Sequence, residues 1–140
     1  MTPNQTNIDG RYRTLLTLWF AIVMSVVIFA VMTLLVPSEA TTDARLSLSL
    51  NCAGIAPLAL SFVLKTQMLG KAVQQHRIDQ VQTAYVLSFA LSEMAALLSV
   101  VDHFVNRGRY FYVGFIFAML GMLLHFPQKR HLLAASGQEF

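Results

Sequence analysis

The stretch QVQTAYVLSFALSEMAALLSVV, residues 80–101, decides the fold class. Its 22 residues contain one charged side chain, Glu93, and the others are apolar, small or polar without charge. A helix needs about 20 mostly apolar residues to cross a bilayer, because each residue adds 1.5 Å. The stretch therefore predicts a membrane-spanning helix with one carboxyl group near its middle.

Three further stretches carry no charge at all. They cover residues 14–38, 46–64 and 110–128, which are 25, 19 and 19 residues long. The 140-residue chain is only 12% charged and is 56% hydrophobic, whereas an ordinary soluble domain is about 25% charged. Runs of this length must be helical in a membrane, since the bilayer offers the backbone no hydrogen bonds. The first run is longer than the apolar part of a signal peptide, so we expect it to be retained.

These runs predict an all-α polytopic membrane protein with four transmembrane helices in a single domain, residues 14–127. The expected helices cover residues 14–36, 46–66, 82–105 and 110–127. Residues 67–81 are expected to form a cytoplasmic loop into which the flanking helices extend, with the turn near Gln75–Ile78. Residues 1–13 and 128–140 are expected to be polar terminal segments with little order.

Basic residues predict the orientation. Seven of the ten lie in or beside the N-terminal segment, the loop at 67–81 and the C-terminal segment. They are Arg11, Arg13, Lys65, Lys71, Arg77, Lys129 and Arg130, against Arg45, Arg107 and Arg109 at the other two loops. Because cytoplasmic loops are enriched in Lys and Arg, both termini are predicted to be cytoplasmic. We expect the bilayer of a bacterial inner membrane as partner and, at a net charge of +3, no nucleic acid.

Glu93 is the candidate ion-binding residue. A charge at the bilayer centre costs at least about 2.5–3.5 kcal/mol, and burial favours the neutral form of a carboxyl group. A carboxyl that is neutral against lipid and ionises against a polar path could carry a proton. Ser88 and Ser92 could supply hydrogen bonds from the adjacent face. A structural Glu93 that only bonds a neighbouring helix remains the alternative.

Small residues recur at helical spacing on two of the expected helices. The stripes comprise Ser49, Cys52, Ala56 and Ala59 on the second helix, and Ala84, Ser88, Ser92, Ala95 and Ser99 on the third. Small residues allow membrane helices to approach closely. The stripes predict packing within one four-helix bundle or, alternatively, a face for self-association.

Residues 51–101 carry a further pattern. Pro57 lies in a helix of small residues, Gln74–Arg77 forms a polar connection, and Ala90–Glu93 ends in a carboxylate. This pattern resembles the hairpin of the F-type ATP synthase c subunit, the proteolipid of the proton-driven ring. The resemblance implies a homo-oligomer with Glu93 as its proton-binding carboxyl. It also places Ser61 where sodium-binding members carry a glutamine, which implies protons rather than sodium. The first and fourth expected helices have no counterpart in a simple hairpin.

Two other functions stay open. One is a small proton-coupled exporter of the multidrug type, and the other is a structural membrane bundle that binds a partner membrane protein. No nucleotide-binding loop, metal-spaced Cys/His set or nucleophile–base motif occurs in the sequence, so we expect neither an enzyme nor a metal or other cofactor. His103, His125 and Tyr85 are expected at the membrane interfaces, and Asp102 in an ion pair with Arg107 or Arg109.

Overall fold

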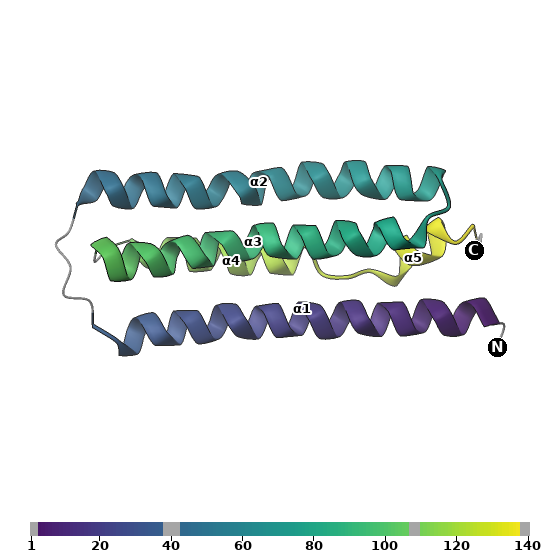
Figure 1. Cartoon of the computed structure of the whole chain (residues 1–140), viewed down its shortest axis with the longest axis horizontal. Helices are drawn as coiled ribbons and strands as arrows, with labels where there is room; N and C mark the ends of the chain where they lie inside the picture. The colour runs from purple at the N-terminus through teal and green to yellow at the C-terminus, as the bar shows by residue number, and fades with distance from the viewer. Residues whose placement is uncertain (1–2, 38–42, 107–109, 138–140) are drawn as a thin grey trace.

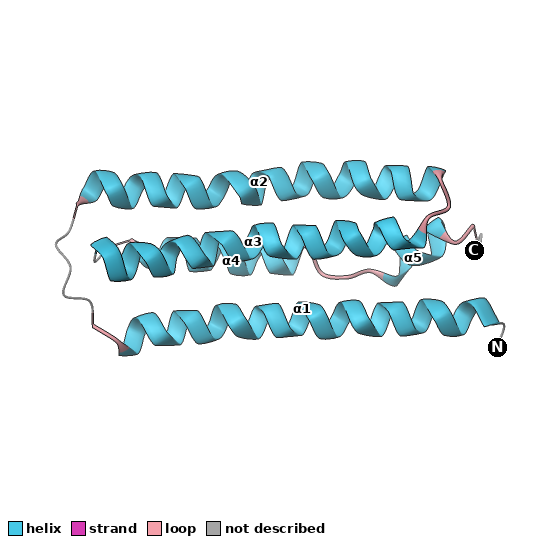
Figure 2. Cartoon of the chain, viewed as in Figure 1, coloured by secondary structure: helices cyan, strands magenta, loops and turns pink. Residues whose placement is uncertain are grey.

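The computed structural model describes residues 3–37, 43–106 and 110–137, and these residues form helices without any strand (Figure 2). The helices are α1 (Pro3–Leu35), α2 (Ala44–Gln74), α3 (Ile78–Asn106), α4 (Phe111–Leu124) and α5 (Lys129–Ala135). The all-α prediction is confirmed. Within the described ranges, α1 from Ile8 onward, α2 and α3 are each long and apolar enough to cross a membrane. They indicate an integral membrane protein.

The short helices α4 and α5 differ from the expected fourth span. They meet at a bend of 50°, and only together do they have the length and apolar character of a span. The bend follows from Pro127, because the residue before a proline is disfavoured in the helical conformation. α4 therefore ends at Leu124, and a three-residue stretch beyond His125 leads to α5.

The expected loop at 67–81 is helical over most of its length. α2 continues to Gln74 and α3 begins at Ile78, so the turn is short and lies at the predicted position. His76 has a φ of 50°, and the Arg77 amide donates to the Ala72 carbonyl at 2.9 Å, which closes the end of α2. The helices extend because Ala72 and Val81 are fully buried beyond the expected spans.

The described parts of both terminal segments are largely helical where little order was expected. α1 begins at Pro3, and Ile8 is buried in a cluster with Leu132 and Ala135 of α5. Lys129 also forms an ion pair with Asp9. Little order was expected because these segments are polar in composition. A few apolar residues on one side of each segment are nevertheless enough to bury that side against the other segment. α5 thus packs on the first turns of α1.

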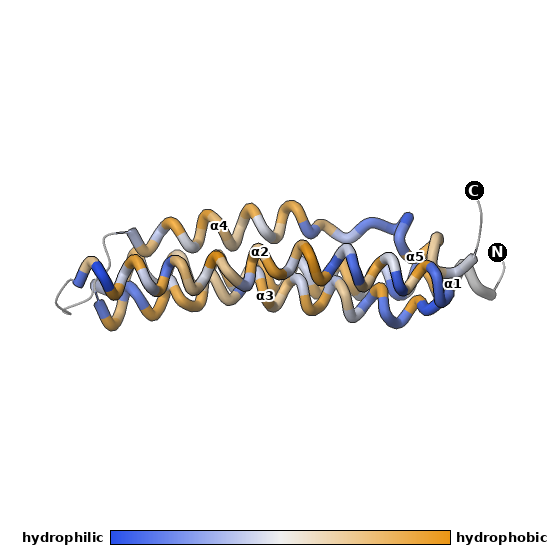
Figure 3. The backbone as a smooth tube through the Cα atoms, turned by 90° about the horizontal axis from the view of Figure 1, so that it is seen from above, coloured by the Kyte–Doolittle hydropathy of each residue, from blue (hydrophilic) through white to orange (hydrophobic). Residues whose placement is uncertain are grey.

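α3 lies at the centre of the bundle and packs against the other four helices (Figure 1). The central position of α3 makes it the most buried of the three long helices. In the most apolar 18-residue stretch of each helix, 44% is buried in α3, 22% in α2 and 11% in α1. The start of α1, the turn between α2 and α3, and α5 all lie at one end (Figure 1). Hydrophobic residues dominate the length of the helices, and hydrophilic ones gather toward their ends (Figure 3).

The two small-residue stripes have different environments. On α3, Ala84, Ser88, Ser92, Ala95 and Ser99 are all buried. The glycines of α4 pack against them, since a Cβ at Gly114 would lie 2.8 Å from the Ala95 carbonyl oxygen. On α2, Ser49, Cys52, Ala56 and Ala59 are all exposed. The α3 stripe therefore lies in the helix contacts inside the bundle. The α2 stripe is not covered by any other described part of the chain.

Candidate ion-binding site

Glu93 lies near the middle of α3 and faces α1. Its Oε1 accepts a hydrogen bond from the Ser25 hydroxyl at 2.9 Å, and both side chains are partly buried. Next to this pair, Val26 of α1 packs with Ala96 of α3 in a small apolar cluster. Among the described residues, no Lys, Arg or His forms an ion pair with Glu93. The carboxyl thus lies between two apolar helices with one serine as its polar partner.

Ser88 and Ser92 are buried, but their hydroxyls bond within their own helix. Ser88 Oγ donates to the Ala84 carbonyl at 2.7 Å, and Ser92 Oγ to the Ser88 carbonyl at 2.8 Å. Ser92 lies against α4, because a Cβ at Gly121 would lie 3.0 Å from its hydroxyl. The two serines thus have polar partners other than Glu93, and their role in ion binding stays a prediction.

Ser61 belongs to a different polar cluster, where α2 meets the end of α4. Its hydroxyl donates to the Leu58 carbonyl at 2.6 Å and lies 3.2 Å from Nε2 of His125. His125 Nδ1 lies 2.7 Å from the Gly121 carbonyl, which can only accept, so Nδ1 carries the proton. His125 is fully buried within the bundle.

Tyr85 extends the polar contacts toward α5 and is likewise fully buried within the bundle. Its hydroxyl accepts from the Gln128 amide at 3.1 Å and lies 2.6 Å from Nδ1 of His131. The ammonium of Lys65 lies 4.6 Å from the centre of the Tyr85 ring. Tyr85 therefore fastens the bent connection between α4 and α5 to the centre of the bundle.

Asp102 is fully buried and has a complete set of partners. It accepts from the Ser47 hydroxyl at 2.7 Å and from the Asn106 side chain at 3.0 Å. Asn106 in turn donates to the Asp43 carbonyl at 2.8 Å, just before α2 begins. The expected partners Arg107 and Arg109 lie outside the described residues. Asp102 thus joins the start of α2 to the end of α3, which is a structural role.

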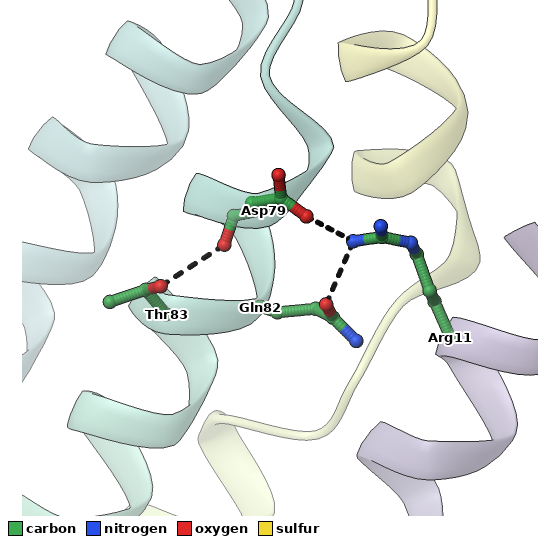
Figure 4. A network of polar contacts seen from close by, with 4 residues as sticks. All are labelled: Arg11, Asp79, Gln82 and Thr83. Atoms are coloured by element: carbon green, nitrogen blue, oxygen red, sulfur yellow. Dashed lines mark hydrogen bonds and ion pairs between the residues drawn. The ribbon is translucent and has the colours of Figure 1, made fainter.

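A groove runs along the contact between α1 and α3. It has a volume of about 590 Å³ and is lined by Thr14, Leu15 and Leu18 of α1 and by Asp79, Gln82, Thr83, Val86, Leu87 and Ala90 of α3. At one end, the Arg11 guanidinium donates to Asp79 and, at 2.9 Å, to Gln82 (Figure 4). At the other end, the lining stops at Ala90, one helical turn before Glu93.

Sequence reasoning found Glu93 but missed its partner, Ser25. The signal was present, because Ser25 is the only hydroxyl-bearing residue in the apolar run 18–32. A polar side chain in such a run is expected to face protein rather than lipid. The sequence gives no comparable indication of the buried cluster around His125. That cluster forms only because the end of α4 packs against α2 in the folded bundle.

Comparison with known proteins yields no match to a family model, a curated protein or a solved structure. The resemblance of residues 51–101 to the proteolipid hairpin thus rests on the residues that carry it. Within the residues whose structure is described, no group of three His, Cys, Asp or Glu side chains is arranged to hold a metal ion.

Proposed function

We propose that the chain is a non-enzymatic integral membrane protein in which Glu93 binds and releases a proton at the contact between α1 and α3. The observation that carries the proposal is the Ser25–Glu93 hydrogen bond near the middle of a span, without a cationic partner among the described residues. A buried carboxylate is costly unless it is paired or well hydrogen-bonded. Glu93 is partly buried and has one serine as its hydrogen-bond partner, which compensates only part of that cost.

The contrast with Asp102 supports this proposal. Both carboxyls belong to α3, yet Asp102 accepts two hydrogen bonds and Glu93 accepts one. An ionised carboxylate has about four acceptor sites, so more donors stabilise its charge. The two donors around Asp102 suit a carboxylate that accepts hydrogen bonds permanently. Glu93 has the sparser environment that a group alternating between two protonation states requires.

We also propose four membrane crossings with both termini in the cytoplasm, in a bacterial inner membrane. The fourth crossing would begin in α4 and end at α5, whose Lys129 and Arg130 lie at its cytoplasmic end. The proposal is supported by the shared position of the start of α1, the α2–α3 turn and α5 (Figure 1). These segments carry Arg11, Arg13, Lys71, Arg77, Lys129 and Arg130, the basic excess that marks a cytoplasmic face.

Self-association in the manner of a c subunit is part of the proposal. It is supported by the antiparallel pair α2 and α3, which packs as a hairpin. It is also supported by the exposed stripe of Ser49, Cys52, Ala56 and Ala59 on α2. Small residues on an exposed membrane helix permit a second helix to approach its backbone closely.

Labelling with dicyclohexylcarbodiimide tests the role of Glu93, because this apolar reagent attacks protonated carboxyls within membranes. We expect the label on Glu93 in the wild-type protein and at the same position in Glu93→Asp, and its loss in Glu93→Gln. The amide oxygen that Glu93→Gln introduces can still accept from Ser25, so the free energy of unfolding should change by less than about 1 kcal/mol. Asp102 serves as the internal control and should stay unlabelled. A wild-type Glu93 that resists the reagent would leave only a structural bundle.

A further inference from the structure

We propose that the groove between α1 and α3 is a water-filled route by which protons reach Glu93 from the end of the bundle that carries Arg11 and Asp79. The inference rests on the proposed function of Glu93. It adds the path by which protons reach the carboxyl and the side of the membrane from which they come. Its basis is the position of the groove, the residues at its two ends and the pattern of its lining.

The lining of the groove points along α3 to Glu93. Asp79, Thr83, Val86 and Ala90 line it at spacings of four, three and four residues, and the next step of three reaches Glu93. Residues at these spacings share one face of a helix. Ala90 precedes Glu93 by about 4.5 Å along the helix axis at 1.5 Å per residue. The lining of the groove thus ends about one helical turn from Glu93.

The wall formed by α1 leads to the same place. Thr14 and Leu18 line the groove, and Ser25 follows Leu18 by seven residues, which is two turns along one face. The hydrogen bonds between α1 and α3 lie at the two ends of this path. Arg11 bonds Asp79 and Gln82 at the outer end, and Ser25 bonds Glu93 at the inner end.

The chemistry of the lining suits water at the mouth and a proton acceptor at the inner end. Thr14, Asp79, Gln82 and Thr83 give the mouth polar groups, and Leu18, Val86 and Ala90 make the inner part apolar. A water occupies about 30 Å³, so a groove of about 590 Å³ has the volume for a chain of waters; past the mouth, the waters would find their hydrogen-bond partners in one another. Glu93 and Ser25 would anchor the inner end of that chain.

Arg11 holds the mouth in place. Its guanidinium reaches from α1 to two side chains of α3, and Thr83 Oγ1 donates to the Asp79 carbonyl one turn away (Figure 4). The two contacts of Arg11 fix the separation of α1 and α3 where the groove opens. The polar groups at the mouth favour water there over lipid tails, which cannot hydrogen-bond.

Accessibility of single cysteines tests the route. In a Cys52→Ser background, Thr83→Cys and Ala90→Cys place thiols at the mouth and at the inner end. The matched control is Val63→Cys, because Val63 is 51% exposed and lies on α2 outside the groove. Val63 and Ala90 lie 13 and 14 residues from His76, so both are about 20 Å from the turn. A charged, membrane-impermeant methanethiosulfonate is applied to either side of sealed vesicles, and Gln75→Cys marks the side of the turn.

We expect Thr83→Cys and Ala90→Cys to react from the side on which Gln75→Cys reacts. Ala90→Cys should react at least about tenfold faster than Val63→Cys, since the thiolate forms only where water solvates it. An Ala90→Cys as slow as Val63→Cys would show that lipid fills the groove and would overturn the route. Should Ala90→Cys disturb folding, Val86→Cys provides the same comparison.

The outcome is separable from the test of Glu93 itself. An unreactive Ala90→Cys together with a carbodiimide-labelled Glu93 would remove the route and keep the proton-binding carboxyl. A reactive Ala90→Cys together with an unlabelled Glu93 would keep the water-filled groove but remove the proposed function, and the proton route with it. Reaction at both positions supports both proposals.

Discussion

Among single residues, Glu93 and Asp102 are two carboxyl groups of the same helix that differ in their hydrogen bonds. Asp102 is fully buried and joins two helix ends through Ser47 and Asn106. Glu93 has Ser25 as its hydrogen-bond partner and the end of a groove close by. Asp102 therefore stabilises the fold, whereas for Glu93 we propose proton exchange.

Asp102→Ala is expected to destabilise the protein strongly. The substitution leaves the Ser47 hydroxyl and the Asn106 amide without their buried acceptor, and an unsatisfied buried donor costs about 1–3 kcal/mol. We expect the free energy of unfolding in detergent micelles to fall by about 2–4 kcal/mol. The neighbouring Val101→Ala is the control, since Val101 is 42% exposed. Equal losses in the two variants would show that Asp102 is not a structural acceptor.

The sequence identifies some of the important single residues and gives no sign of others. A lone charge in a 22-residue apolar run identifies Glu93 without any structure. Ser25 could have been found by the same argument, because it interrupts an equally apolar run. The burial of Tyr85 and His125 could not, since it depends on contacts with α5 and α2, and periodicity assigns a face to a residue but not its partner.

At the scale of elements, the contact between α3 and α4 depends on glycine. A Cβ at Gly114 would lie 1.9 Å from the Ser99 hydroxyl and 2.8 Å from the Ala95 carbonyl oxygen, which is backbone and cannot move alone. Gly114→Ala must push α4 away from α3. We expect it to destabilise the bundle by about 1–3 kcal/mol, as overpacking does.

Gly70→Ala is the matched control for this prediction. Gly70 lies inside α2, and a Cβ there would meet no atom within 4 Å. Replacing a helical glycine by alanine should stabilise the protein by about 0.5–1 kcal/mol. Thermal unfolding in detergent should therefore shift in opposite directions for the two variants. A shift in the same direction would contradict the close packing of α4 on α3.

The position of α5 depends on Tyr85. Tyr85→Phe keeps the ring and removes the hydroxyl that bonds the Gln128 amide and His131. Hydrogen bonds contribute about 0.5–1.5 kcal/mol each, so α5 should open on the order of tenfold more often. Trypsin cleavage after Lys129 and Arg130 measures this opening. Tyr112→Phe, at an exposed tyrosine of α4, should leave the cleavage rate unchanged. Equal rates in the two variants would show that Tyr85 does not fasten α5.

The helices follow from the gaps between charges, and the turn between α2 and α3 lies where it was expected, but the start of α1 and the fold of α5 were not expected. The charge-free runs predict where α1, α2 and α3 cross the membrane. The helical extensions at residues 3–13 and 67–81 carry charges, and charges predict segments outside the spans. They are helical because Ile8, Ala72 and Val81 each bury one side against the bundle, and a few apolar positions among polar ones leave only a weak periodic signal.

At the scale of the whole molecule, the membrane class is predictable and the neighbours of each helix are not. The charge gaps and the lone carboxyl leave open which helix Glu93 faces. The structure places α1 over it, although α1 has no counterpart in the proteolipid hairpin that residues 51–101 resemble. The order of helices around α3 follows from how side chains fit, and hydropathy does not encode that fit.

Self-association should depend on the exposed stripe of α2. Ala56→Leu adds bulk at the centre of this stripe, so we expect a smaller assembly than that of the wild type. Native mass measurement of the purified protein gives the number of copies. Val31→Leu, at an exposed position of α1, should leave the number unchanged. A monomeric wild-type protein would contradict the proposed homo-oligomer.

We propose that Glu93 exchanges a proton within the membrane. Infrared spectroscopy of the protein in lipid bilayers tests it most directly, because the protonated carboxyl has its own C=O stretching band. Comparison of the wild type with Glu93→Gln assigns the band to this residue. We predict a Glu93 band that shifts in D₂O and disappears as the pH is raised. A carboxyl that stays ionised at every pH, or a band that never exchanges with D₂O, would contradict the account.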